Sequence, residues 1–117
     1  MKLPNGQKAV VDEAKLRDYC LNPLHHRGQH KARRFRNLLG ITAADASKLR
    51  LLLLTAAAKS DAQVAIFDSF DQRYAIDMEL QTSGGSVVLR SAWIIRIDED
   101  YPRLASCYIL SKSMAYR

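Results

Sequence analysis

The chain has 117 residues, a length typical of one domain, and we expect residues 1–117 to fold as a single unit. Hydrophobic residues make up 48% of it, which excludes a mainly disordered chain. The formal charge of +6 favours an anionic partner such as nucleic acid or an acidic protein. Because no apolar run resembles a signal peptide or could span a bilayer, the sequence predicts a cytoplasmic protein without membrane contact.

The N-terminal residues favour a hairpin followed by a helix. A Pro-Asn-Gly turn separates two short apolar runs, and Asn-Gly is a strong hairpin signal because both residues tolerate positive φ. The sequence therefore predicts an N-terminal β-hairpin that pairs residues 2–3 with residues 9–11. Asp12 is suited to cap a helix over residues 13–21, and Pro23 stops that helix.

Two further helices are predicted before residue 60. Apolar residues recur at helical spacing over residues 29–39, and Gly40 is a natural end for this helix. Thr42 and Asp45 resemble a capping box at the start of a third helix, which would run to about residue 58. The residues of the third helix expected to face the core are Ala46, Leu49, Leu53 and Ala56.

After Lys59 the apolar period changes from that of a helix to that of a strand. Four strands separated by turn residues are predicted over residues 63–67, 73–80, 87–97 and 104–110. The expected fold class is α+β, with the N-terminal β-hairpin and three helices packed on a four-stranded antiparallel meander.

The basic segment, residues 21–35, holds all three histidines and no acid, and no carboxylate occurs between Asp18 and Asp45. A helix start, a lysine and histidines that exchange protons near neutral pH would together suit a phosphodiester. Three interpretations follow from this composition: cleavage of nucleic acid, binding of nucleic acid without chemistry, and a solvated helix face with loop-packed histidines.

Two later positions admit both a functional and a structural interpretation. Ser91 interrupts an apolar row that includes Trp93, so it is either a small core residue or a phosphate contact in a cleft where Trp93 stacks on a base. Arg103 follows a proline, and either binds phosphate or forms a salt bridge with Asp98 or Glu99.

Neither a metal nor a cofactor is expected. The histidines lack a nearby carboxylate that would complete a coordination sphere, and the Gly-Gly pair lies in a turn between strands rather than before a helix. Cys20 and Cys107 have neither metal-site nor redox-pair spacing, which favours reduced, buried thiols over a disulfide.

The chain also resembles a family of small, uncharacterised bacterial domains, known only as a domain of unknown function. That family begins with a Lys-Leu-Pro-Asn-Gly-like stretch and carries the pattern Asn-Pro-x-His-x-x-Gly-x-x-Lys-Ala. In this sequence the pattern is Asn22, Pro23, His25, Gly28, Lys31 and Ala32. A departure is His26, where the family pattern suggests proline, which leaves open whether His25, His26 or His30 matters.

The order of helices and strands is remotely similar to the barnase, EndoU and RelE-like ribonucleases, many of which are toxins. This resemblance implies an arginine, a serine or threonine, and a histidine or lysine arranged around RNA. It is a fold-level analogy and supplies no residue assignments of its own.

We therefore expect a metal-independent endoribonuclease-like toxin or effector domain acting on RNA. The expected catalytic residues are His25 as general acid or base, Lys31 as a cation for the phosphorane, and Ser91 as a phosphate ligand. The expected nucleic-acid-binding residues are Arg27, His30, Arg33, Arg34, Tyr74, Trp93 and Arg103.

The alternative is a non-catalytic accessory protein of a phage or toxin operon, which would use the same basic segment to bind nucleic acid or a protein partner. An acidic antitoxin or immunity protein would be such a partner. A folded scaffold or oligomer subunit without either activity is the third possibility.

Overall fold

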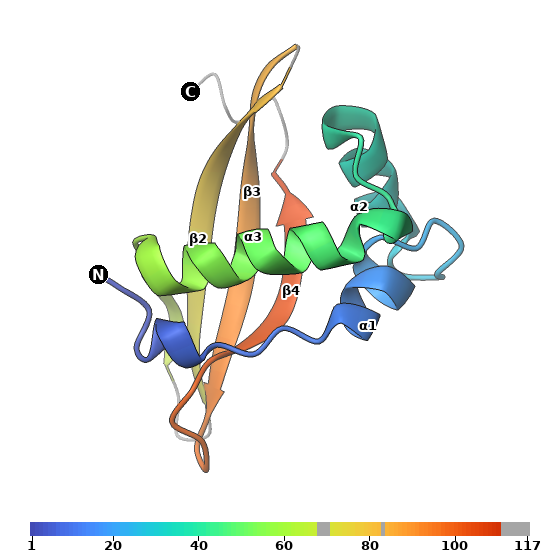
Figure 1. Cartoon of the computed structure of the whole chain (residues 1–117). Helices are drawn as coiled ribbons and strands as arrows, with labels where there is room; N and C mark the ends of the chain where they lie inside the picture. Colours follow the sequence, from blue (N-terminus) through green and yellow to red (C-terminus); the bar gives the residue numbers. More distant parts are fainter. Residues whose placement is uncertain (68–70, 83, 111–117) are drawn as a thin grey trace.

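The computed structural model describes residues 1–67, 71–82 and 84–110. The helices are α1 (Glu13–Lys15), α2 (Gln29–Arg34) and α3 (Ala46–Lys59), and the strands are β1 (Gln63–Phe67), β2 (Asp71–Thr82), β3 (Gly85–Arg96) and β4 (Arg103–Ile109) (Figure 1). Shorter helical turns are the 3-10 turns η1 (Gly6–Lys8) and η4 (Ala43–Asp45) and the π-helical turns η2 (Leu16–Cys20) and η3 (Phe35–Leu39). No helix among the described residues has the length and apolar character needed to cross a membrane.

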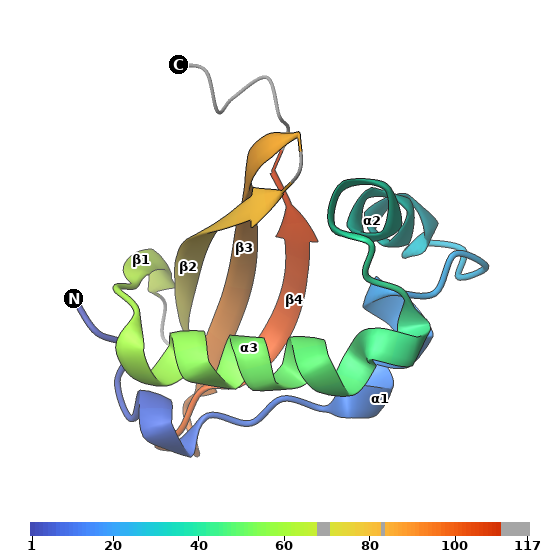
Figure 2. The ribbon, with the colours of Figure 1, turned by 45° about the horizontal axis from the view of Figure 1, so that its top comes forward.

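The four strands form one antiparallel sheet in the order β1-β2-β3-β4, which confirms the predicted meander and the α+β class. β2 and β3 pair over their whole length, from Asp71 opposite Arg96 to Thr82 opposite Gly85. The β3–β4 ladder shifts register after Ala92. Because β4 is last in the strand order, it is an edge strand, and α2 lies beside that edge (Figure 2).

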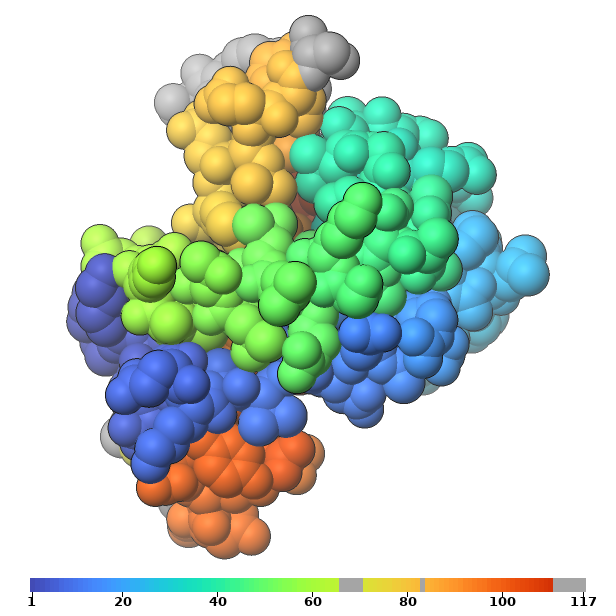
Figure 3. Space-filling view, in the orientation of Figure 1, coloured from blue at the N-terminus to red at the C-terminus, as the bar shows by residue number. Residues whose placement is uncertain are grey.

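One face of the sheet is covered by α3 and forms the core (Figures 1 and 3). Strand alternation directs Ile76, Leu89 and Trp93 to this face, where each is at most 1% exposed. Residues of the opposite parity, such as Ala92 and Ser106, are only half-buried. We call their side the open face, because no described helix lies over it (Figure 1).

The predicted N-terminal β-hairpin is wrong. Asn5 has the positive φ of 52° that a turn requires, but the chain continues into η1. Residue Lys2 then bridges to Asp61, and Val10 bridges to Arg103 in β4. An isolated two-stranded hairpin is marginal in water, whereas these pairings keep the flanking apolar side chains buried against the core.

The helical predictions hold in position but not in regularity. The second helix spans residues 29–39 as expected, although it divides into α2 and the π-helical η3, and Gly40 ends it at φ 68°. The predicted core residues of α3, namely Ala46, Leu49, Leu53 and Ala56, are all buried. Leu51 is 62% exposed, because α3 buries only the stripe that faces the sheet.

Substitution of Gly6 tests how closely the N-terminal segment must approach α3. A Cβ atom at this position would lie 1.9 Å from the carbonyl oxygen of Ala57. We expect Gly6→Ala to lower the free energy of unfolding by about 1–3 kcal/mol, measured by urea denaturation, because the segment must move off the helix. Gly84→Ala is the matched control, since a Cβ there meets nothing within 4 Å. Equal unfolding midpoints for the two variants would contradict this role of Gly6.

Candidate nucleic-acid interface

The loop between η2 and α2 is held together by side chains that bond to the backbone. The Asn22 side-chain amide donates to the Asp18 carbonyl at 3.2 Å, and its oxygen accepts the Leu24 N–H at 2.9 Å. His25 Nδ1 accepts the backbone N–H groups of Arg27 and Gly28, each at 3.0 Å. The Asn-Pro-x-His-x-x-Gly pattern is therefore a loop-forming motif in this fold.

These contacts limit what His25 can do chemically. Because Nδ1 accepts two hydrogen bonds, the neutral ring carries its proton on Nε2, and taking up a second proton at Nδ1 would break both bonds. The ring packs edge-on against Tyr19, with 4.7 Å between centroids. This geometry accounts for His25 as a structural residue and opposes its expected action as a general base.

Lys31 extends from α2 to the edge of the sheet. Its Nζ donates to the hydroxyl groups of Tyr19 in η2 at 3.2 Å and of Ser106 in β4 at 3.0 Å. The ammonium also lies 5.0 Å from the ring centroid of Tyr19 and 5.6 Å from that of Tyr108. We call these four residues the Lys31 cluster. Within the described part of the chain, Lys31 has no carboxylate at ion-pair distance, so its charge is fixed but not neutralised.

A second cation lies next to this cluster on the open face. Arg90 in β3 makes a bidentate ion pair with Asp77 in β2, at 2.7 and 2.8 Å. The hydrogen bonds from Arg90 lower the pKa of the Asp77 carboxyl group, and the same pair raises the pKa of Arg90. Arg90 lies opposite Tyr108 in the β3–β4 ladder, which places it next to the Lys31 cluster.

The exposed basic side chains of the basic segment and of η3 form another surface feature, which we call the basic surface: Arg27, His30, Arg33 and Arg36. His30, Arg33 and Arg36 are three apart within the helix over residues 29–39, a spacing that places successive side chains on neighbouring positions. Arg27 lies in the loop before this helix. In the regions that the structure describes, none of the three arginines has a carboxylate within 4.0 Å. Arg34, also expected to bind nucleic acid, instead donates to the Leu110 carbonyl at 2.9 Å and fastens the helix to the end of β4.

Three predicted site residues lie in the core rather than at a surface. Ser91 is 1% exposed, and its hydroxyl accepts the indole N–H of Trp93 at 2.9 Å. Trp93 and Tyr74 are 1% and 5% exposed, so the folded domain offers neither ring to a base. Ser91 faces the helices, whereas Lys31 contacts Ser106, whose side chain belongs to the open face. The structure therefore does not bring Ser91 to His25 and Lys31.

Arg103 forms the salt bridge that was one of its two expected roles. Its guanidinium donates to both Glu99 oxygens, at 2.9 and 2.8 Å, and to the Tyr101 hydroxyl at 2.9 Å. These bonds from Arg103 lower the pKa of Glu99 to about 2. Arg103 thus holds the β3–β4 connection instead of standing free for a phosphate.

The two cysteines are free and buried, as predicted. The neighbouring Cys20 thiol, together with burial, raises the pKa of Cys107 in β4 well above its ordinary value. Cys107 therefore remains protonated at neutral pH and packs as a small, mostly apolar side chain.

Sequence reasoning missed the hydroxyl partners of Lys31. The alternation within residues 104–110 places Ser106 and Tyr108 on one face of their strand, but nothing local connects that strand to α2. Tyr19 lies in the first predicted helix, beside its apolar stripe, and this position alone does not indicate a contact with Lys31. Their meeting depends on β4 being the edge strand next to α2.

The structural role of His25 can be separated from a chemical one by mutation. We expect His25→Ala to lower the free energy of unfolding by about 1–3 kcal/mol, because two backbone N–H groups lose their acceptor. His26→Ala is the control, since His26 is exposed and its side chain has no hydrogen bond in the described structure; it should change stability by less than about 0.5 kcal/mol. Urea denaturation measures both, and equal stability of the two variants would contradict the loop role.

Comparison with known proteins supports the expected membership in an uncharacterised family of unknown function. No curated protein and no solved structure gives a significant match. A family model matches residues 2–111, nearly the whole sequence. The chain belongs to the family described as Domain of unknown function (DUF6883).

Proposed function

We propose that this domain binds single-stranded RNA through the basic surface and the Lys31 cluster. The observation that carries the proposal is the set of exposed arginines, Arg27, Arg33 and Arg36, that have no carboxylate partner in the described residues. Unneutralised cations attract phosphates and release bound counterions, which supplies most of the affinity in such complexes.

The Lys31 cluster supports a single strand rather than a duplex. Tyr19 and Tyr108 are half-buried and lie next to the Lys31 ammonium, so aromatic rings and a cation occur together at the edge of the sheet. Proteins that recognise single-stranded RNA combine stacking on aromatic rings with contacts to the backbone phosphates. The remote resemblance to ribonucleases favours RNA over DNA as the ligand.

Salt-dependent binding of a labelled single-stranded RNA, followed by fluorescence anisotropy, tests this proposal. We expect the Arg33→Gln, Arg36→Gln double variant to bind more weakly and to reduce the slope of log K against log salt by about 1.4, since each lost phosphate contact contributes about 0.7. The Lys8→Gln, Arg96→Gln double variant removes the same charge from exposed positions elsewhere. If this control loses as much affinity, binding is a general effect of net charge and the proposed interface is wrong.

Cleavage of the bound RNA is the second candidate function, and the Lys31 cluster is the observation that favours it. In such cleavage the 2′-oxygen loses its proton to water and bonds to the adjacent phosphorus, while the bond from phosphorus to the 5′-oxygen breaks and that oxygen takes up a proton, which leaves a 2′,3′-cyclic phosphate. Negative charge builds up on the phosphorus-bound oxygens during this step, and a fixed cation stabilises that charge. Lys31 is held by Tyr19 and Ser106, whose hydroxyl groups can also donate to phosphate oxygens. In this arrangement Ser106 takes the part first expected of Ser91.

Incubation of RNA with the protein in the presence of EDTA tests cleavage separately from binding. We expect cleavage to persist in EDTA and to fall about 100-fold in Lys31→Met, which keeps an unbranched side chain one atom shorter and removes the charge. Lys31→Arg should retain more activity than Lys31→Met. Intact RNA with the unmodified protein would reject cleavage and leave the binding proposal standing.

A further inference from the structure

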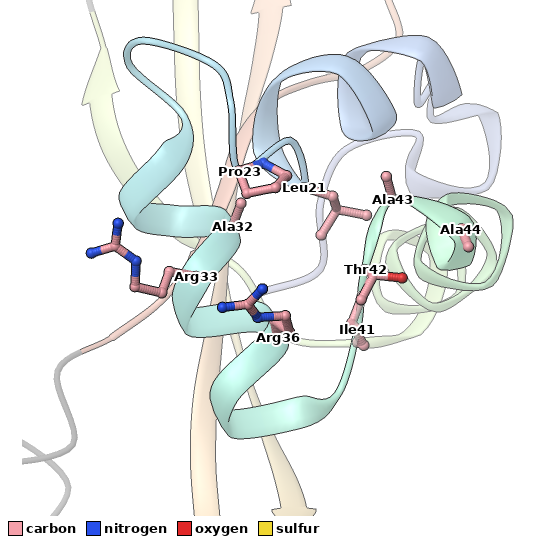
Figure 4. Close-up of a pocket in the computed structure, with 9 residues that line it drawn as sticks. All are labelled: Leu21, Pro23, Ala32, Arg33, Arg36, Ile41, Thr42, Ala43 and Ala44. Atoms are coloured by element: carbon pink, nitrogen blue, oxygen red, sulfur yellow. The ribbon is translucent and has the colours of Figure 1, made fainter.

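A pocket opens between the second helix, the loop after η2 and residues 41–44 (Figure 4). Its volume is about 260 Å³. The apolar part of its lining is contributed mainly by Leu21, Pro23, Ala32, Ile41 and Ala43. Arg33 and Arg36 complete the lining from one side of the helix, with Arg36 between Arg33 and residues 41–44 (Figure 4). The site is therefore apolar inside and cationic along one side.

The size of the pocket limits what can enter it. Sites for drug-sized molecules and cofactors usually have volumes of about 300–1,000 Å³, so about 260 Å³ suits one large side chain better than a whole nucleotide. Side chains of this kind, seated in a pocket and surrounded by polar contacts, contribute much of the affinity in protein interfaces.

The chemistry of the lining also favours a protein side chain over a nucleobase as the occupant of the pocket. Among the described residues that line the pocket, none is aromatic, and Thr42 is the only neutral one whose side chain has a hydrogen-bonding group. Nucleobases are recognised by stacking on aromatic or guanidinium planes and by hydrogen bonds to their edges. An aliphatic cavity of this size offers instead the burial that favours leucine or phenylalanine.

The positive charge beside the pocket favours acidic residues on either side of the partner side chain that enters it. Arg33 and Arg36 are exposed and, among the described residues, have no carboxylate at ion-pair distance. Guanidinium groups pair bidentately with carboxylates. We propose that the pocket receives a leucine- or phenylalanine-sized side chain from an acidic protein segment, whose carboxylates pair with Arg33 and Arg36. This docking site goes beyond RNA binding and does not depend on it.

Blocked pentapeptides provide the probes, with amide chemical-shift titration of the protein as the measurement. We expect Glu-Glu-Phe-Glu-Glu to bind saturably and to shift the amides of Ile41 and Ala43. Glu-Glu-Ala-Glu-Glu should bind at least about tenfold more weakly, because it buries less apolar surface. Lys-Lys-Phe-Lys-Lys should not bind, because its charges repel the two arginines.

Two variants place the binding at this pocket. Ala44 lines the pocket and is exposed, so Ala44→Trp should fill its mouth and weaken the phenylalanine peptide at least about tenfold without unfolding the protein. Arg36→Gln should weaken the same peptide, whereas Arg96→Gln removes an exposed arginine from β3 and should leave binding unchanged. Thermal unfolding and unchanged shifts far from the pocket confirm that the variants are folded.

The outcomes that overturn the proposal are equally specific. Absence of saturable shifts, equal binding of the phenylalanine and alanine peptides, or full binding by both Ala44→Trp and Arg36→Gln would each reject it. An oligouridylate that shifts the pocket amides when the acidic peptide does not would identify a nucleobase site instead. Because the peptide titration contains no RNA, its failure is distinguishable from failure of the RNA-binding proposal.

Discussion

Burial of one face of the sheet under α3 is the constraint on which the rest of this structure depends. Trp93 and Ile76 pack on that side with Leu49 and Leu53 of α3, and all four are almost completely inaccessible to solvent. An antiparallel sheet of alternating residues can bury one face and leave the other in water. The residues of the open face, including Arg90, thereby stay half-buried or exposed.

The basic segment and the adjoining Arg36 have two different roles in this fold. His25 orders the loop before α2, Arg34 bonds to the end of β4, and Lys31 reaches Ser106 across the edge of the sheet. These residues position the helix. Arg33 and Arg36 remain exposed and without an ion pair among the described residues, so they supply the charge that draws an anion. A cluster of cations in sequence therefore separates into positioning and binding residues.

Both proposals place an anionic partner on the same helix, but the two partners would contact different groups there. RNA would use the exposed cations and the tyrosine rings around Lys31, whereas an acidic protein segment would use the apolar pocket beside Arg33 and Arg36. Because these two arginines serve both surfaces, an acidic partner seated in the pocket would compete with RNA for them. Such competition is a direct way for a protein partner to regulate access of RNA to the domain.

The sequence by itself determined the order of the elements from residue 13 onward, the strand alternation, and the bounds of the helix at residues 29–39, because these follow from local periodicity and from Gly40 as a helix end. Tertiary structure alone decided what the N-terminal residues pair with, since Asp61 and Arg103 are distant in sequence. It also decided that Lys31 meets Ser106 rather than Ser91, because only strand order and the covered face select which hydroxyl group a helix beside β4 can reach.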